Sequence, residues 1–308
     1  MSRFLISMLK TSCAGLACAL FLLLDCANAA PLKLTLVLSE AGGAYREYSE
    51  ALEAMLVNKS VTLQVIEAGN TLPESDFIIA AGMKAASTIA QESSPAKLAV
   101  LVPKESFNKL LNEIASQPKC AANNYSAIYL DQPYKRQLDL ITAALPHVQS
   151  IGVLYGQPPE ELNVIRHLAA TRKLVLHERS SVDVANLYNN LHAILLNSDV
   201  LLAMPDAEIY SASTIRNILL ASYRNKVPLI GFSPAYVKAG ALCAVYSTPT
   251  QIAKQSFGFI QEFKATGILL PAQSPKEFEV TINEQVAHSL GLNIKSASKL
   301  RSDIGAGP

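Results

Sequence analysis

The feature that most constrains the fold of this chain is an alternation of short apolar runs with stretches of helical period. The first half carries four such runs, at residues 34–38, 61–66, 77–81 and 98–102. Helices are predicted from Tyr45 to Met55, where apolar residues recur at three- and four-residue steps, between the last two runs, and over 104–115. Continuous apolar strands joined by helices predict a mainly parallel sheet covered on both faces, and therefore the α/β class.

The same pattern returns in the second half of the chain. Strands are predicted at 151–155, 175–177, 200–204 and 229–232, and helices at 160–172, 184–195 and 209–224. A chain of 308 residues also exceeds the size at which one core usually splits, about 250–300 residues. We therefore expect two lobes, each built on its own sheet.

The join between the two series predicts how the lobes are connected. A polar loop at 120–125 leads into a short strand at 126–130 and a helix that runs to Leu145. After the second series come a strand at 241–246, an amphipathic helix that starts at Thr248-Pro249, a strand at 278–282 and a short helix. We predict that residues 30–130 plus 246–277 form lobe 1 and residues 131–245 plus 278–308 form lobe 2, joined by a multi-strand hinge.

The first 29 residues read as a secretory signal peptide. A basic start with Arg3 and Lys10 precedes an apolar stretch at 13–24, and Ala27-Asn28-Ala29 offers a cleavage site. The alternatives are a membrane anchor, for which the apolar stretch is short, and a lipoprotein, for which the residues around Cys18 and Cys26 match poorly. We expect the mature protein to be periplasmic.

Charge and cysteine content exclude several classes of function. The chain has 26 Lys and Arg against 25 Asp and Glu, with no basic run, which argues against a nucleic-acid surface. Beyond the signal peptide only Cys120 and Cys243 remain, either as a disulfide or as two separate thiols. The five histidines are scattered without metal-ligand spacing, so we expect neither a metal nor a cofactor.

Two motifs resemble catalytic or phosphate-binding loops but lack a required element. Residues 231–235 approach the nucleophile elbow G-x-S-x-G around Ser233, yet Pro234 has no N–H for an oxyanion. The Gly42-Gly43 pair lacks the phosphate-loop pattern and reads as a flexible turn, although it could hold a ligand carboxylate. The Glu160-Glu161 pair complements a helix dipole. We predict that the protein is not an enzyme.

The carboxyl ends of the predicted strands carry the candidate binding residues, because ligands of open parallel sheets bind there. A cleft with hydroxyls, carboxylates and tyrosines but no catalytic set suits a binding protein. Asp206 is the strongest candidate. The full predicted ligand-binding set is Ser39, Glu40, Gly42, Gly82, Met83, Asp131, Tyr155, Asp206, Ser233 and Tyr246.

Several segments carry a family resemblance. Residues 150–155, 199–206 and 226–231, then 240–242, 277–283 and 287–292, resemble the substrate-binding proteins of ABC transporters, of the kind called uncharacterised periplasmic components. The match runs from Tyr125 to Ile294, whereas residues 31–120 agree only in the order of strands and helices, and the loop after the first strand is atypical.

The resemblance implies a type I periplasmic binding fold whose two lobes, joined by three hinge crossings, close around a small polar solute. Some relatives take amino acids, and for such a ligand Asp206 would meet the ammonium group, Ser39 and Gly42-Gly43 the carboxylate, and Tyr155 or Tyr246 an aromatic side chain. The implied partner is the membrane permease of an ABC transporter, and we expect a monomer. A ligand-sensing module that reports to a receptor or kinase is the alternative, and a secreted serine hydrolase that uses Ser233 is a weaker one.

Overall fold

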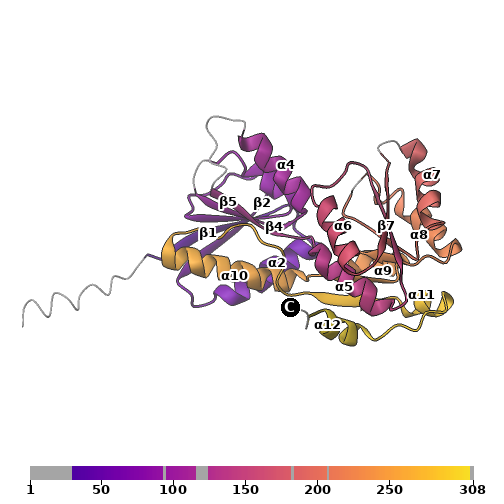
Figure 1. Cartoon of the computed structure of the whole chain (residues 1–308). Helices are drawn as coiled ribbons and strands as arrows, with labels where there is room; N and C mark the ends of the chain where they lie inside the picture. The colour runs from indigo at the N-terminus through magenta and orange to yellow at the C-terminus, as the bar shows by residue number, and fades with distance from the viewer. Residues whose placement is uncertain (1–29, 93–94, 116–123, 182–183, 207, 306–308) are drawn as a thin grey trace, which may run out of the picture.

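The computed structural model describes residues 30–92, 95–115, 124–181, 184–206 and 208–305, and it has two lobes side by side (Figure 1). The predicted signal peptide and Cys120 lie outside these residues. Cys243 is a free thiol, and complete burial raises its pKa to about 12. None of the helices that the structure describes is long and apolar enough to cross a membrane.

The first lobe is built on a five-stranded parallel sheet with the order β2-β1-β3-β4-β5. The strands are β1 (Leu32–Leu38), β2 (Val61–Glu67), β3 (Phe77–Ala81), β4 (Ala96–Val102) and β5 (Tyr125–Tyr129), and the helices are α2 (Gly43–Leu56), α3 (Met83–Thr88), α4 (Lys104–Ala115) and α10 (Pro249–Thr266).

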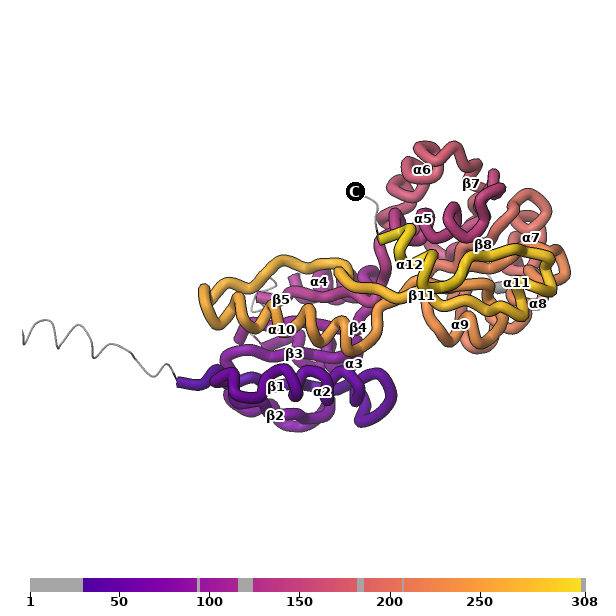
Figure 2. The backbone as a smooth tube through the Cα atoms, turned by 90° about the horizontal axis from the view of Figure 1, so that it is seen from below, coloured from indigo at the N-terminus to yellow at the C-terminus, as the bar shows by residue number. Residues whose placement is uncertain are grey.

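Both faces of this sheet are buried under helices. Along β1, Leu36 and Leu38 pack in one apolar cluster with α2 and α10, whereas Val37 packs in another with α3 and α4. Successive strand side chains point to opposite faces, so a strand that is buried at every position, as β1 is over 34–38, requires helices on both sides. This explains why α10, which is distant in the sequence, returns to lie on the first lobe (Figure 2).

The second lobe is built on a six-stranded sheet with the order β11-β10-β9-β8-β6-β7, in which only β11 is antiparallel. The strands are β6 (Ser150–Tyr155), β7 (Val175–Ser180), β8 (Val200–Leu202), β9 (Leu229–Gly231), β10 (Cys243–Tyr246) and β11 (Glu279–Ile282). The helices are α5 (Tyr134–Ala144), α6 (Leu162–Thr171), α7 (Val184–Leu195), α8 (Ile215–Arg224), α9 (Pro234–Ala239), α11 (Glu284–Ser289) and α12 (Ala297–Gly305). The predicted α/β class, with two mainly parallel sheets flanked by helices, is confirmed.

Three segments pass between the lobes, and hydrogen bonds tie them together. Gln132, in the first segment, donates to Ser247 Oγ in the second at 2.8 Å, and Ser247 donates to the Glu277 carbonyl oxygen in the third at 2.5 Å. Arg136 donates to the Pro275 carbonyl oxygen at 3.1 Å. Gln132 and Ser247 are both buried, so the three crossings form one compact hinge. The exact lobe boundaries at 130/131, 245/246 and 277/278 remain predictions.

The helix predicted over 209–224 is wrong at its start, because α8 begins only at Ile215. Thr214 Oγ1 accepts a hydrogen bond from the Ser211 N–H at 3.0 Å and donates one to the Ile209 carbonyl oxygen at 2.6 Å. Such side-chain bonds to nearby backbone favour turns over helix. The short helix α9 and the terminal helix α12 were not predicted.

Candidate functional site

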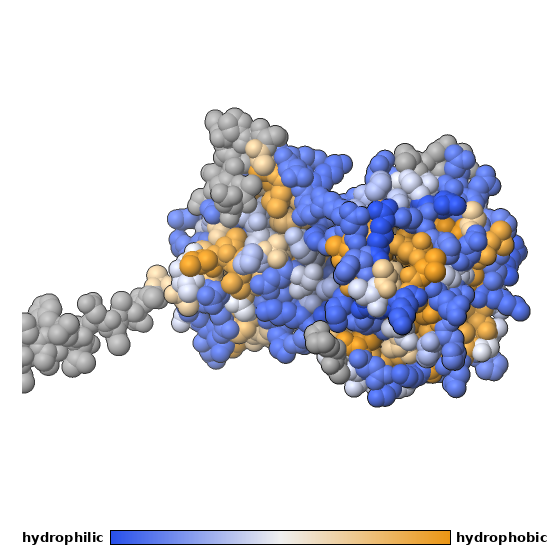
Figure 3. Space-filling view, in the orientation of Figure 1, coloured by the Kyte–Doolittle hydropathy of each residue, from blue (hydrophilic) through white to orange (hydrophobic). Residues whose placement is uncertain are grey.

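A pocket lies between the two lobes, at the carboxyl ends of the strands. The second sheet contributes Tyr155, the last residue of β6, and Asp206, after β8. The first lobe contributes Lys104 and Glu105 at the start of α4, the first crossing contributes Asp131 and Gln132, and α5 contributes Tyr134 and Gln137. The other lining residues are Asn108, Gln157, Pro159, Glu160, Glu161, Met204 and Pro205. In Figure 3 the surface at the notch between the lobes is hydrophilic. Because both lobes line the pocket, its shape depends on how they are placed relative to each other.

The wall from the second lobe stands where the order of the sheet reverses, between β6 and β8, which is where ligands of open α/β sheets bind. Asp206 organises this wall. Its Oδ2 accepts a hydrogen bond from the Gly156 N–H at 2.7 Å, and its Oδ1 accepts from the N–H groups of Glu208 and Ile209 at 2.9 and 3.1 Å. The carboxylate therefore joins the loop after β8 to the loop after β6 and also faces the pocket.

Asp131 lies in the first crossing, after β5, and fixes the start of α4. Its Oδ2 accepts a hydrogen bond from the Lys104 N–H, at the start of α4, at 2.6 Å. Burial raises the pKa of the Asp131 carboxyl, and the charge of Glu161 acts in the same direction, against the Lys104 hydrogen bond and charge. A carboxylate is thus held in the pocket where its charged form is unfavourable.

Two side-chain contacts bridge the mouth of the pocket from lobe to lobe. Lys104 Nζ forms an ion pair with Glu161, and Asn108 Nδ2 donates to Glu160 Oε2 at 3.2 Å. Burial lowers the pKa of Lys104, but the hydrogen bond and charge of Glu161 outweigh it and the net shift is upward. The space left inside for water-sized molecules is about 50 Å³, small beside the ~300–1,000 Å³ of typical ligand sites. The two walls therefore leave little free volume between them.

Of the ten residues predicted to bind a ligand, three line this pocket: Asp131, Tyr155 and Asp206. The Tyr155 hydroxyl donates to Glu178 Oε2 at 3.3 Å. Asp131 and Asp206 follow β5 and β8, and Tyr155 ends β6. The three come together because the carboxyl ends of these strands face the gap between the lobes.

The residues predicted after β1 and β3 do not line the pocket. Ser39 is buried, and its Oγ accepts a hydrogen bond from the Ala85 N–H at 3.0 Å, which occupies the hydroxyl in fixing α3. Gly82 precedes α3 with φ of 89°, and Met83, half-buried, packs against the cluster under α3. Glu40 and Gly42 are exposed beside them.

Ser233 and Tyr246 also lie outside the pocket lining. Ser233 is the N-cap residue of α9, and Pro234 follows as its first residue. In a serine hydrolase the residue after the nucleophile donates its backbone N–H to the oxyanion. Pro234 holds that position and has no N–H. Tyr246 ends β10 at the second crossing, where burial, and then the charge of Glu279, raise its pKa.

Sequence reasoning missed the pocket residues that belong to helix starts: Lys104, Glu105, Asn108, Tyr134, Gln137, Glu160 and Glu161. The one usable signal was Pro103, which marks the end of β4 and places 104–108 at the same sheet edge as Asp131. Glu161 does precede α6, as the dipole interpretation expected, but it also reaches Lys104 on the other lobe.

Comparisons with known proteins agree with this architecture. A family model described as ABC transporter substrate binding protein matches residues 74–301. A search among curated proteins found no match.

Solved structures of similar fold cover nearly the whole chain. A conserved domain protein from Vibrio cholerae is 23% identical with a TM-score of 0.58 over 88% of this chain and 98% of that one. The ligand-free, open structure of a substrate-binding protein with adhesive properties from Clostridium difficile is 16% identical with a TM-score of 0.66 over 86% and 96%. An ABC domain from Streptococcus pneumoniae in complex with L-Trp is 14% identical with a TM-score of 0.59 over 88% and 98%. These likenesses confirm the predicted two-lobed type I periplasmic binding fold.

Proposed function

Because the chain belongs to the ABC transporter substrate-binding protein family, we propose that it captures a small polar solute in the pocket between its lobes and delivers it to the membrane permease of an ABC-type importer. One observation carries this proposal: side chains of both lobes line a single pocket at the carboxyl ends of two parallel sheets. An amino acid or a related compound fits a pocket lined by carboxylates, amides and tyrosines.

The proposed mechanism is a hinge motion. A solute that touches both walls stabilises the closed arrangement, because a ligand shifts a conformational equilibrium only by its differential affinity for the two states. The three hydrogen-bonded crossings form the hinge. When the lobes close, Lys104 and Asn108 of α4 contact residues 160–161 of the other lobe. The closed surface then docks on the permease, and no turnover is needed.

We further propose that the mature protein acts in the periplasm as a monomer. Two arguments support the compartment: the signal-peptide pattern of residues 1–29, and the family, whose members are normally periplasmic. The sensing alternative predicts the same pocket and differs only in the partner that recognises the closed form.

A thermal-shift screen tests solute capture. Residues 30–308 would be unfolded, dialysed and refolded to remove any carried ligand, and then melted with amino acids, diamines, nucleosides, sugars and organic anions. A solute at a hundred times its Kd stabilises the fold by ~2.7 kcal/mol, a shift of several degrees for a protein of this size. A hit that is lost when a pocket residue is changed supports the proposal. A cooperatively melting protein that no solute stabilises contradicts it.

A further inference from the structure

The pocket carries a marked excess of negative charge. Five carboxylates line it, namely Glu105, Asp131, Glu160, Glu161 and Asp206. Among the described residues, Lys104 is the only Lys or Arg in the lining, and its ammonium group is already paired with Glu161. A solute that carries negative charge would enter against this field, whereas a cation would be attracted.

The carboxylates also act on one another. The pKa of Glu105 is raised by burial and then by the charges of Asp206, Glu160 and Glu208, with Lys109 opposing. Glu105 comes from α4 in the first lobe, and Asp206 and Glu160 come from the second. Like charges on opposite walls disfavour closure, and a positively charged group placed between them would turn that repulsion into attraction.

A second and independent observation is a buried acceptor without a donor. Gln137, in the first turns of α5, lines the pocket and is 3% exposed. Its Nε2 donates to the Gln132 carbonyl oxygen at 3.0 Å, which fixes the orientation of the amide. Its Oε1 has no hydrogen-bond partner within the part of the chain that the structure describes. A buried acceptor in this position calls for a donor, and ammonium or guanidinium groups carry only donors.

Two tyrosine rings complete the surroundings of such a group. Tyr134 and Tyr155 line the pocket beside Asp131 and Gln137. The pKa of Tyr134 is raised by burial and then by the charges of Glu161, Asp131 and Glu105, which places its ring among the carboxylates. Aromatic faces attract organic cations, most strongly where water is excluded.

We propose that the solute is an organic cation with one or more ammonium or guanidinium groups and a net positive charge, and that Asp131, Glu105 and the Gln137 Oε1 receive those groups. This inference rests on the proposed solute-binding function and specifies its substrate class. A metal ion suits the pocket less well, because no three His, Cys, Asp or Glu side chains in the described ranges are grouped as ligands of one ion.

Calorimetric titration of the refolded protein with solutes of similar size tests this inference. The cations are 1,4-diaminobutane, agmatine and lysine; the matched solutes are 1,4-butanediol, leucine, ribose and succinate. We expect at least one cation to bind and its affinity to fall as salt is raised. Asp131→Asn and Glu105→Gln keep the size of each side chain and should each weaken that affinity at least tenfold. Glu262→Gln, an exposed change on α10, should leave it unchanged.

The outcomes separate this inference from the proposed function. Binding of a neutral, zwitterionic or anionic solute with no binding of any cation overturns the cationic class and leaves solute capture intact. Binding of a cation that neither Asp131→Asn nor Glu105→Gln weakens, in variants that melt cooperatively, overturns the assignment of the receiving residues. Failure of every solute to bind the folded protein contradicts both proposals.

Discussion

Asp131 shows at the scale of one residue how a binding site is maintained at a cost to the fold. It follows a buried strand, accepts a hydrogen bond from the Lys104 N–H and stands beside the charges of Lys104 and Glu161. Its pKa is nevertheless raised, with burial as the main cause. A carboxyl group buried in such a place serves the binding of a ligand better than it serves the stability of the ligand-free protein.

Asp131→Asn is therefore expected to stabilise the ligand-free protein at neutral pH. Because the folded-state pKa lies above that of the unfolded chain, ionisation of Asp131 destabilises the fold as pH rises through the folded pKa. The melting temperature of the variant should exceed that of the wild type at pH 7. The difference should shrink as pH falls through the folded-state pKa of Asp131, and it should be lost below about 4, where the carboxyl is protonated in both the folded and the unfolded chain. Melting curves recorded from pH 3 to 8 check this. A gain that does not vary with pH would mean that the charge is not its cause.

Gly82 was predicted to bind a ligand, but the structure gives it a structural role, because there is no room for a side chain at this position. Its φ is 89°, and a Cβ there would lie 2.5 Å from Ser39 Oγ and 2.6 Å from the Tyr45 hydroxyl oxygen. Gly82→Ala should lower the free energy of unfolding by about 1–3 kcal/mol. Gly42→Ala is the matched control, since Gly42 has φ of −132° and a Cβ there would meet no atom within 4 Å. Urea denaturation measures both changes, and equal losses would contradict this account.

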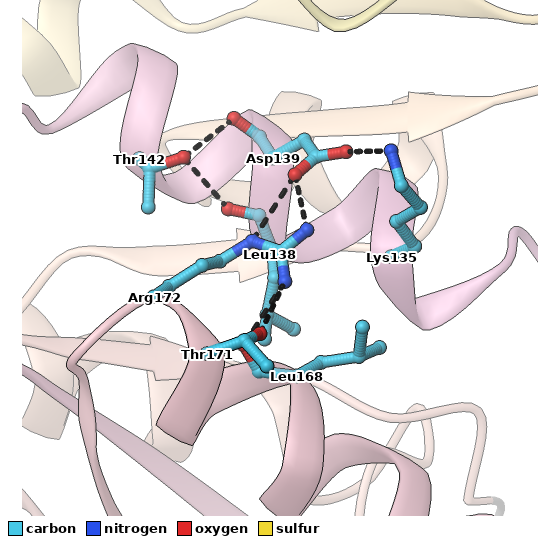
Figure 4. Close-up of polar contacts among 7 residues, drawn as sticks. All are labelled: Lys135, Leu138, Asp139, Thr142, Leu168, Thr171 and Arg172. Atoms are coloured by element: carbon cyan, nitrogen blue, oxygen red, sulfur yellow. Dashed lines mark hydrogen bonds and ion pairs between the residues drawn. The ribbon is translucent and has the colours of Figure 1, made fainter. Parts of the chain in front are cut away.

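At the scale of one element, α5 connects the hinge, the pocket and the core. Tyr134 and Gln137 line the pocket, Leu138 and Ile141 are buried in the second lobe, and Arg136 reaches the third crossing. Figure 4 shows the remaining face, where Asp139 Oδ1 accepts hydrogen bonds from Arg172 Nη2 and, at 3.1 Å, from Arg172 Nε. Arg172 also donates to the Leu168 carbonyl oxygen at 2.9 Å, so this cluster fixes α5 against the end of α6.

Arg172→Ala should lower the free energy of unfolding by about 1–3 kcal/mol, because it removes hydrogen bonds between charged groups that are largely buried. Lys135→Ala removes the exposed partner of the same carboxylate, 3.2 Å from Asp139 Oδ2, and should cost only about 0.3–0.5 kcal/mol. Urea denaturation compares the two. If Lys135→Ala were the more damaging change, Arg172 would not be the contact that holds α5 in place.

At the scale of the whole molecule, the lobes meet through polar contacts across the pocket mouth. Glu161 is about one-third exposed and pairs with Lys104 of the other lobe, and Asn108 adds a bond to Glu160. Partly exposed ion pairs contribute little each, so the contacts can hold the lobes together and still release them. A few weak bonds at the mouth and a tightly bonded hinge suit repeated opening.

Glu161→Gln is expected to shift the ligand-free protein towards an open arrangement, because it replaces the ion pair between the lobes with a weaker contact. Small-angle X-ray scattering should show a larger radius of gyration, and a bound solute should restore the smaller value. Lys299→Gln, which removes an exposed ion pair within α12, should leave the radius unchanged. A radius that is the same in Glu161→Gln and the wild type would show that this pair does not control closure.

The elements with a strong local signal could be predicted from the sequence, and those formed by turn chemistry could not. The strands at 34–38 and 77–81 and the helix after Thr248-Pro249 were predicted because periodicity and a capping pattern are properties of neighbouring residues. The predicted start of α8 was wrong because the hydroxyls of Ser211 and Thr214 form hydrogen bonds that compete with the helix. Those bonds depend on the local three-dimensional structure.

The sequence by itself determined the α/β class, the two series of strands and helices, and the strand ends at which Asp131, Tyr155 and Asp206 stand, because these follow from the spacing of apolar residues. Only the tertiary structure decided which strand ends face each other. It placed Lys104, Glu105 and Gln137 in the pocket and left Ser39 and Gly82 in a structural role beside α3. The physical reason is that the pocket lies between two separate sheets, so its lining depends on the hinge that orients them and on no local pattern in the chain.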